Sequence, residues 1–483
     1  MLKSFQLLQL MDLKQNMIPD NTKKIHLTAI CGTGMGALAC MLKDIGFEVT
    51  GSDQKIYPPM SDFLFRKGIK VAEGFTEDNV SYSPDLVVVG NAVTKDNPEV
   101  VKMRSMGLNF CSMPQAINRF IAGDKKQIVI TGTHGKTTTS SILTWILYEA
   151  GLDPSFIIGG ILKNFDSNYR IGKGGFIVIE GDEYDTAFFD KGAKFLHYNP
   201  YRAALTSVEF DHADIFKDID HVKRVFDVFV SGISEKSILF AFDGDSNVEG
   251  LVRGRQCRVE KYGKDTGSDW RLSSVSINSP RSVVEIVKHG IPFGTFKTEL
   301  MGEHNILNAL SAIAIADSLM IPAEVISGAL ETFQGIKRRQ EVRGSKRGIT
   351  VMDDFAHHPT AVRETIRAVK PFYPKGRLIA VFEPRTNSSM RKVFQAVYPL
   401  SFDHADIICI RKPPLLEKIP LLDRFSSEKL VDDLNNSGKN AHFFPETESI
   451  IDFLAKEARP GDVILIMSNG GFDNIHERLL DKL

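Results

Sequence analysis

The sequence has few cysteines, no long apolar run and almost no net charge. Its five cysteines are scattered and never spaced as CxxC, so we expect neither a zinc module nor a disulfide framework. We expect the cysteines to be reduced thiols, as in a cytoplasmic protein. No apolar stretch approaches the roughly 20 residues that span a bilayer. The net charge of −1 offers no broad basic surface for nucleic acid or a membrane. Small molecules are therefore the expected ligands, with no obligate protein partner.

The N-terminal stretch "MLKSFQLLQLMDLKQNMIPD" is only briefly apolar. Gln and Asp12 interrupt it, and no small-residue cleavage site follows. We expect an extension, or translation that starts at Met17, rather than a signal peptide.

The length of 483 residues predicts roughly three domains. Short β-branched runs alternate with helix-like segments throughout, which predicts an α/β fold with largely parallel sheets. The predicted strands are "KIHLTAI", "DLVVVG", "QIVIT", "FIVIE", "ITVMD", "RLIAVF", "ADIICI" and "DVILIM". We place the domains at residues 21–122, 123–336 and 337–483. Residues 259–298 alternate apolar and polar side chains and should add antiparallel strands to the second domain.

A glycine-rich turn follows the first predicted strand and precedes a helix. Glycines permit the tight turn and let backbone N–H groups approach a pyrophosphate at the helix N-terminus. The expected contacts come from Gly32, Thr33, Gly34, Met35 and Gly36, with Asp53 at the end of the next strand placed to meet a ribose hydroxyl. NAD and a UDP-sugar are both compatible with this turn, and a merely structural turn is the plainer alternative.

A second turn, "GTHGKTTTS", follows the strand "QIVIT" and precedes the predicted helix "SILTWILYEAG". The ordinary phosphate-binding loop, GxxxxGK[ST], fails here because Ile130 stands where its first glycine belongs. The cradle geometry can survive, with Lys136 reaching the β/γ-phosphates of ATP and Thr137 offering a hydroxyl to Mg²⁺. The predicted ATP-binding residues of this turn are Gly132, Thr133, His134, Gly135, Lys136, Thr137 and Thr138.

Two acidic segments follow predicted strands, at the position where an ATPase places its metal carboxylate. The first contains Glu180, Asp182, Glu183 and Asp185, and the second contains Glu209, Asp211, His212 and Asp214. Oxygen-rich surroundings favour Mg²⁺ or Mn²⁺. A solvated acidic loop and a structural histidine are the alternatives.

Two later segments carry further candidates. "MGEHNILNA" begins a helix near Gly302 and places His304, Asn305 and Asn308 on its first turns, with the two asparagines on one face. "MDDFAHHP" follows another strand with Asp353, Asp354, His357 and His358. The carboxyl end of a parallel strand is where open α/β sheets hold ligands.

Together these motifs resemble the Mur ligase family, the ATP-dependent amide-forming enzymes of peptidoglycan assembly. "TGTHGKTTT" is similar to that family's shortened phosphate loop, and "GEHNILNA", "GIKRRQE" and "DDFAHHP" follow in the family's order. The resemblance covers the chain from about Lys23 onward. It implies an N-terminal Rossmann-like UDP-binding domain, a central phosphate-loop ATPase domain and a C-terminal Rossmann-like domain that holds the peptide.

Within the family, "ICGTGMGALA" and "THGKTTT" resemble the branch that uses UDP-N-acetylmuramate. One group in that branch adds L-alanine, and another adds the tripeptide L-Ala-γ-D-Glu-meso-diaminopimelate during cell-wall recycling. "GDEYDTAFFDKG", "EFDHADIF", "FEPRTNSSM" and "MSNGGF" favour the tripeptide group. The alanine-adding group remains the alternative.

The resemblance also implies residue roles. Lys136, Glu180, His212 and Arg339 would be catalytic, and Thr137, Glu180 and His212 would hold the metal. His304, Asn305, Asn308, Arg339 and Asp354 would contact ATP, and His357 would orient groups near the peptide. Some relatives carry a carbamylated lysine where this chain has Asp227, so we assign no such modification.

The expected reaction explains why one chain needs two phosphate turns. ATP would phosphorylate the muramyl carboxylate, and the peptide amine would displace phosphate from the acyl phosphate. Arg385 is the candidate for a peptide carboxylate, with a plain surface arginine as the alternative. We also expect closure of the third domain over the second to shield the acyl phosphate from water.

Two other classes of protein fit less well. An NAD-dependent oxidoreductase leaves the Lys136 loop unexplained, and an inactive nucleotide-binding regulator would lack the catalytic groups that this chain has.

Overall fold

The computed structural model describes residues 16–483, which form two compact units. The first unit contains the described chain through Val208, together with Lys223–Lys261 and Ile315–Ile321. The second contains Glu209–Val222, Tyr262–Ala314 and Pro322–Leu483. Most of the N-terminal stretch for which we expect an extension lies outside the described residues.

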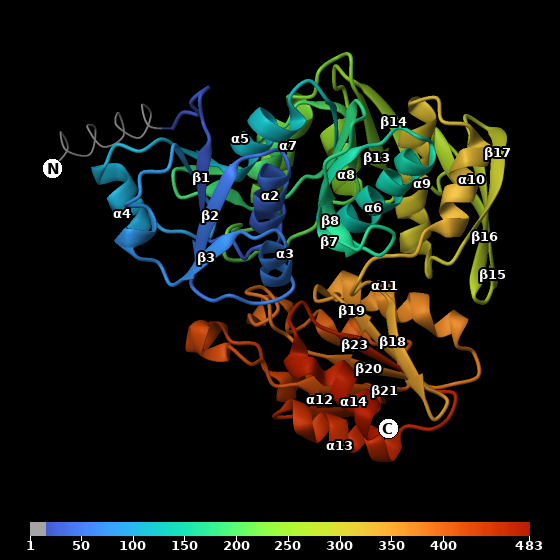
Figure 1. Cartoon of the computed structure of the whole chain (residues 1–483). Coiled ribbons are helices and arrows are strands. Elements are labelled where there is room, and N and C mark those ends of the chain that lie inside the picture. Colours follow the sequence, from blue (N-terminus) through green and yellow to red (C-terminus); the bar gives the residue numbers. More distant parts are fainter. Residues whose placement is uncertain (1–15) are drawn as a thin grey trace. The chain divides into compact units, whose positions relative to one another are not determined.

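The first unit begins with a five-stranded parallel sheet in the order β3-β2-β1-β4-β5, of which Figure 1 labels β1, β2 and β3. The strands are β1 (Lys24–Thr28), β2 (Glu48–Asp53), β3 (Lys70–Glu73), β4 (Leu86–Val89) and β5 (Phe110–Ser112). The helices are α2 (Thr33–Asp44), α3 (Met60–Arg66), α4 (Pro98–Ser105) and α5 (Met113–Ala116). Strand order reverses between β1 and β4, so the glycine turn after β1 lies at the point where doubly wound sheets bind ligands.

The same unit contains a second parallel array in which β6 is central. Its order is β13-β12-β6-β9-β7-β8, with only the β7–β8 pair antiparallel. The strands are β6 (Lys126–Thr131), β7 (Ser155–Leu162), β8 (Ser167–Arg170), β9 (Phe176–Glu180), β12 (Pro200–Leu205) and β13 (Ile238–Phe242), and a small hairpin joins β10 (Asp185–Ala187) to β11 (Asp190–Ala193). The helices are α6 (Lys136–Glu149), α7 (Ile219–Ser231), which starts in the second unit, and α8 (Ser246–Val252). The turn after β6 is thus flanked by the ends of β9 and β12.

The second unit confirms the expected antiparallel strands. After β14 (Arg258–Gly263), strands β15 (Trp270–Asn278), β16 (Arg281–Lys288) and β17 (Ile291–Thr298) pair antiparallel in sequence. Helix α9 (Glu303–Ser318) follows and ends in the first unit, and α10 (Ala323–Thr332) packs on β17.

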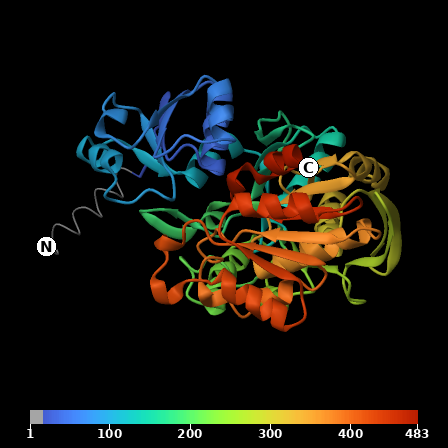
Figure 2. The same ribbon diagram turned by 90° about the horizontal axis from the view of Figure 1, so that it is seen from below.

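The remainder of the second unit is a six-stranded sheet that is buried on both faces. Its order is β18-β19-β23-β20-β21-β22, and only β18 is antiparallel to its neighbour. The strands are β18 (Glu341–Lys346), β19 (Ile349–Asp354), β20 (Leu378–Phe382), β21 (Ile407–Arg411), β22 (Ala441–Phe444) and β23 (Val463–Met467), and the helices are α11 (Pro359–Val369), α12 (Ser427–Asn436), α13 (Thr447–Glu457) and α14 (Ile475–Lys482). Figure 2 shows these strands between helices on both sides.

Residues along β20 alternate between two cores. Leu378, Ala380 and Phe382 join the cluster that includes α11 and α12, whereas Ile379 and Val381 join the cluster that includes α13 and α14. Alternation is the geometry of a strand, and burial on both faces explains why the sequence reads as a continuous apolar run.

All eight predicted strands are present, but the helices after both glycine turns begin earlier than expected. Helix α2 begins at Thr33 and α6 at Lys136, so part of each motif forms the first helical turn. The five cysteines are buried and form no disulfide. Among residues 16–483, no helix combines the length and the apolar character required to cross a membrane.

Replacement of Phe382 by alanine tests the packing of this sheet. The side chain is fully buried against Tyr398 and Phe402, with ring centroids 5.1 and 5.9 Å away. Phe382→Ala should lower the free energy of unfolding of the second unit by about 3–5 kcal/mol in urea denaturation. Phe65→Ala, at a side chain that is 84% exposed, is the control and should change stability by less than about 0.5 kcal/mol. Equal effects of the two changes would contradict this description of the core.

Candidate active site

The turn after β6 is fastened to the loop that follows β12. The Thr133 N–H donates to the Ser207 carbonyl (2.9 Å), and the His134 N–H donates to Ser207 Oγ (2.9 Å). Gly132 has a φ of +128°, and a Cβ there would lie 2.2 Å from Thr206 Oγ1. Both the backbone conformation and the lack of space therefore require glycine at this position.

The Lys136 ammonium group is held by the turn itself and by an acid that follows β9. It donates to the carbonyls of Gly132 (2.5 Å) and Thr133 (3.3 Å) and pairs with Glu183 Oε2 at 2.7 Å. Burial favours the neutral amine, but the charges of Glu183, Asp182 and Glu180 outweigh this effect and raise the pKa of Lys136. Lys136 is therefore a cation at neutral pH.

Glu180, the last residue of β9, faces the first turn of α6. Its Oε1 accepts from Thr137 Oγ1 (3.0 Å), and its Oε2 accepts from the Gly159 N–H (2.7 Å). The Thr137 hydroxyl and the Glu180 carboxylate are adjacent hard oxygen donors, which is the donor set that Mg²⁺ prefers. The residues present thus fit the expected metal.

The first glycine turn is stabilised by Asp53. Asp53 Oδ2 accepts from the Cys31 N–H (2.8 Å), and the Thr33 carbonyl accepts from Asn168 Nδ2 (3.3 Å). Gly34, Met35 and Gly36 lie in the first turns of α2. One oxygen of Asp53 is therefore engaged by the turn, and its predicted ribose contact remains a prediction.

In the second unit, the acidic loop of residues 209–214 lies beside the start of α11. Asp211 Oδ1 accepts from the His212 N–H (2.6 Å), and Asp211 Oδ2 lies 4.0 Å from His357 Nε2. Burial acts to raise the pKa of Asp211, but His212, His357 and His358 together with the His212 N–H outweigh it and hold that pKa well below the usual value. Burial lowers the pKa of His357 despite the attraction of Asp211, so the ring is neutral at pH 7.

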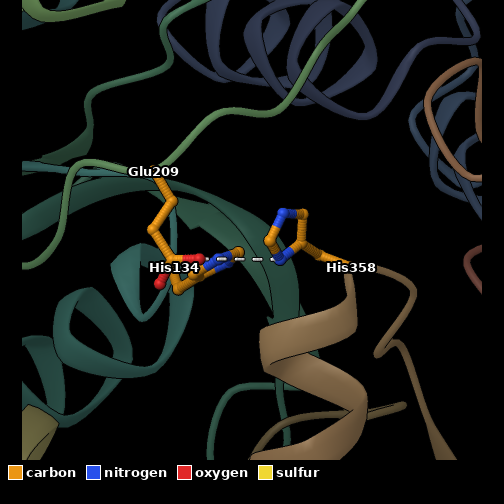
Figure 3. A group of neighbouring side chains, drawn as sticks. All are labelled: His134, Glu209 and His358. Carbon is orange, nitrogen blue, oxygen red and sulfur yellow. Dashed lines mark ion pairs between the residues drawn. The ribbon is translucent and has the colours of Figure 1, made fainter. Parts of the chain in front are cut away.

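A second carboxylate–histidine pair lies next to the first. Figure 3 shows the Glu209 carboxylate facing the His358 ring, and Glu209 Oε2 lies 3.9 Å from His358 Nδ1. The same carboxylate accepts from Thr360 Oγ1 (2.7 Å), and His358 Nε2 contacts the Phe210 carbonyl (3.2 Å). His358 is also the N-cap of α11, where its Nδ1 accepts from the Thr360 N–H.

The segment after α10 brings several predicted ATP contacts together. Asn305 Nδ2 donates to Gln340 Oε1 (3.0 Å), and Asn308 Nδ2 donates to Asn305 Oδ1 (3.5 Å). Both asparagines therefore lie on one face of α9, and His304 lies in its first turn.

Arg339 and Asp354 lie beside that segment. The Arg339 guanidinium carbon is 4.7 Å from the centre of the Phe355 ring. Asp354 accepts from the N–H groups of Gln340 (2.8 Å) and Ala356 (2.7 Å). Burial raises the pKa of Asp354, although the positive charge of Arg339 opposes this change.

Within the first unit, the structure brings together Lys136, Thr137 and Glu180, whereas the glycine turn and Asp53 belong to the other sheet. Within the second, it brings together His212 with His357 and Arg339 with Asp354. Arg385 lies elsewhere in that unit, beyond the end of β20.

Glu183 was predicted only as one of several acids after β9, without a role of its own. Glu183 lies three residues beyond Glu180, and this spacing was the only signal in the sequence. Its pairing with Lys136 could not be predicted, because it depends on the parallel register of β6 and β9.

Three family models match the chain in order: "Mur ligase family, catalytic domain" at residues 24–125, "Mur ligase middle domain" at 130–316, and "Mur ligase, glutamate ligase domain" at 338–470. They confirm the α/β fold with the expected three-domain architecture of this family.

Comparison with known proteins gives matches over nearly the whole length. The chain is 38% identical to the UDP-N-acetylmuramate–L-alanyl-γ-D-glutamyl-meso-2,6-diaminoheptandioate ligase of Escherichia coli K12, over 95% of this chain and 98% of the relative. It is 34% identical in sequence to a murein peptide ligase from Psychrobacter arcticus whose crystal structure is known. The two structures match with a TM-score of 0.71, over 95% of this chain and 98% of that one. It is 32% identical to the UDP-N-acetylmuramate–L-alanine ligase of Clostridium tetani, over 93% of this chain and 96% of the relative. With three domain models in the family's order and relatives matched from end to end, the chain belongs to the Mur ligase family.

Proposed function

We propose that this protein is an ATP-dependent ligase that joins the carboxylate of UDP-N-acetylmuramate to the amine of L-Ala-γ-D-Glu-meso-diaminopimelate in peptidoglycan recycling. The observation that carries the proposal is the group formed by Lys136, Thr137 and Glu180 at the end of a parallel sheet, in a chain of this family. The choice of peptide follows the 38% identity to a tripeptide ligase, compared with 32% to an alanine ligase.

The turn after β6 is the proposed site of ATP. Its N–H groups and the N-terminus of α6 would bind phosphate oxygens, and Lys136 would exchange its carbonyl contacts for the β- and γ-phosphates. Because Lys136 is a cation at neutral pH, it would stabilise negative charge on the oxygens of the transferring phosphoryl group. Thr137 and Glu180, with His212 as a further candidate, would hold Mg²⁺, which supplies Lewis-acid stabilisation of those oxygens.

The remaining predicted residues would place the two other substrates. The turn from Gly32 to Gly36, with Asp53, would bind the UDP group, and Arg385 would bind a carboxylate of the peptide. The ATP contacts proposed for the second unit are His304, Asn305, Asn308, Arg339 and Asp354.

Amide formation then needs two balanced steps. The muramyl carboxylate oxygen attacks the γ-phosphorus, ADP leaves, and an acyl phosphate forms. The neutral peptide amine attacks the acyl carbon, the tetrahedral intermediate loses phosphate, and the amine proton passes to a base. His357 has suitable chemistry for that base, because its ring is neutral and its Nδ1 contacts the Phe355 carbonyl at 2.9 Å, which leaves Nε2 with its lone pair when Nδ1 carries the proton.

The choice of acceptor is tested by ADP release with ATP, Mg²⁺ and UDP-N-acetylmuramate, with the amide product identified by mass. L-alanine and the tripeptide are supplied in separate reactions. We expect turnover with the tripeptide and none above background with alanine. Turnover only with alanine would overturn the proposed peptide and make the protein an alanine-adding ligase.

Replacement of Lys136 by alanine tests the proposed phosphate role. Lys136→Ala should reduce ligation on the order of a hundredfold or more, because charge on the phosphoryl oxygens loses its cation. Binding of UDP-N-acetylmuramate, measured by calorimetry, should persist and would show that the variant is folded. Lys236→Ala, at an exposed lysine of the same unit, should retain full turnover. Wild-type turnover by Lys136→Ala would refute the role.

A further inference from the structure

Arg385 and Gly470 lie at the same edge of the six-stranded sheet. Arg385 follows β20 and Gly470 follows β23, and these strands pair in parallel with Phe382 opposite Met467. The Glu383 N–H donates to the Met467 carbonyl (3.1 Å) and continues the pairing beyond the strands. The carboxyl edge of such a sheet is where doubly wound folds place their ligands.

The Arg385 side chain occupies the space that a side chain at position 470 would take. A Cβ on Gly470 would lie 2.2 Å from Arg385 Cδ, 2.4 Å from Nε and 2.9 Å from Cζ. Gly470 does not have a positive φ, so its backbone would accept alanine without strain. Alanine at position 470 would therefore force the end of the Arg385 side chain to move.

A buried carboxylate, Glu383, also lies near the guanidinium. Glu383 is fully buried, accepts from Ser468 Oγ (2.7 Å) and forms a short ion pair with Arg411. Its Oε1 lies 3.6 Å from Arg385 Nη1, which is attractive but too long for a hydrogen bond. Glu383 thus attracts the Arg385 guanidinium without occupying its N–H donors.

The loop that carries Gly470 is itself held in place. Arg338 Nη2 donates to the carbonyls of Ser468 and Gly470, both at 2.6 Å, and the Gly470 N–H donates to Ser468 Oγ (3.0 Å). The loop that packs against Arg385 is therefore held by hydrogen bonds of its own. Throughout residues 16–483, no hydrogen bond from the Arg385 guanidinium to another group is present, and the side chain is 31% exposed.

We propose that Gly470 and Glu383 are positioning residues that hold the Arg385 guanidinium ready for a free carboxylate of the peptide substrate. A guanidinium binds a carboxylate through two parallel hydrogen bonds, so its orientation decides how well the peptide binds. The inference rests on the proposed function, because it assumes that a peptide is the acceptor.

Two adjacent glycines provide a matched test. Gly470→Ala places a methyl group in the space of the guanidinium, whereas a Cβ on Gly471 would meet nothing within 4 Å, and Gly471 has a helical φ of −74°. Gly470→Ala should raise KM for the tripeptide about 10- to 100-fold, the effect of losing a charge-assisted hydrogen bond. KM for ATP and for UDP-N-acetylmuramate should stay unchanged, which also shows that the variant is folded. Gly471→Ala should behave as wild type.

A combined variant separates positioning from a general disturbance of the loop. Arg385→Ala should raise KM for the tripeptide as much as Gly470→Ala does. The double variant should raise KM no further than either single variant. Additive losses would show that Gly470 acts independently of Arg385 and would overturn the proposal.

Modified peptides identify the group that Arg385 binds. Each free carboxylate of the tripeptide is replaced in turn by a carboxamide, and kcat/KM is measured for wild type and Gly470→Ala. For the peptide that lacks the carboxylate bound by Arg385, wild type and Gly470→Ala should have the same kcat/KM. The same ratio for every peptide, or equal activity of Gly470→Ala and Gly471→Ala, would overturn the inference while leaving the ligase function intact. A wild-type enzyme that does not use the tripeptide would instead refute the proposed function and, with it, this inference.

Discussion

The buried cation at Lys136 is the constraint on which the proposed active site depends. An ammonium group in this position needs compensation, because burial favours the neutral amine. Glu183 and the carbonyls of the turn provide that compensation. The same arrangement explains why Gly132 must be glycine, since the turn that surrounds Lys136 is pressed against Thr206. A cation held by partners that a phosphate can replace is suited to nucleotide binding, and the charge remains available for the phosphoryl group in transfer.

Parallel pairing explains how residues far apart in sequence reach one place. β6 and β9 bring Lys136 beside acids more than forty positions later, and β20 and β23 bring Arg385 beside Gly470. In each case the side chains that interact lie beyond the ends of the strands, and the pairing of the strands determines which of them meet.

Much of the fold could be read from the sequence, because buried parallel strands have a distinctive composition. "RLIAVF" and "DVILIM" predicted β20 and β23. The starts of α2 and α6 were placed too late, since glycine suggests a loop although these glycines sit where a helix begins. The Lys136–Glu183 pair and the contact between Arg385 and Gly470 could not be predicted, because both depend on strand register and on side-chain direction rather than on local pattern.

The most direct test of the central claim follows the oxygen atoms of the muramyl carboxylate. UDP-N-acetylmuramate labelled with ¹⁸O in that carboxylate is incubated with ATP, Mg²⁺ and the tripeptide, and the released phosphate is analysed by mass spectrometry. Attack of the carboxylate on the γ-phosphorus predicts one labelled oxygen in each phosphate, with ADP as the other product. Unlabelled phosphate, or release of AMP and pyrophosphate, would contradict the reaction assigned to the Lys136 turn.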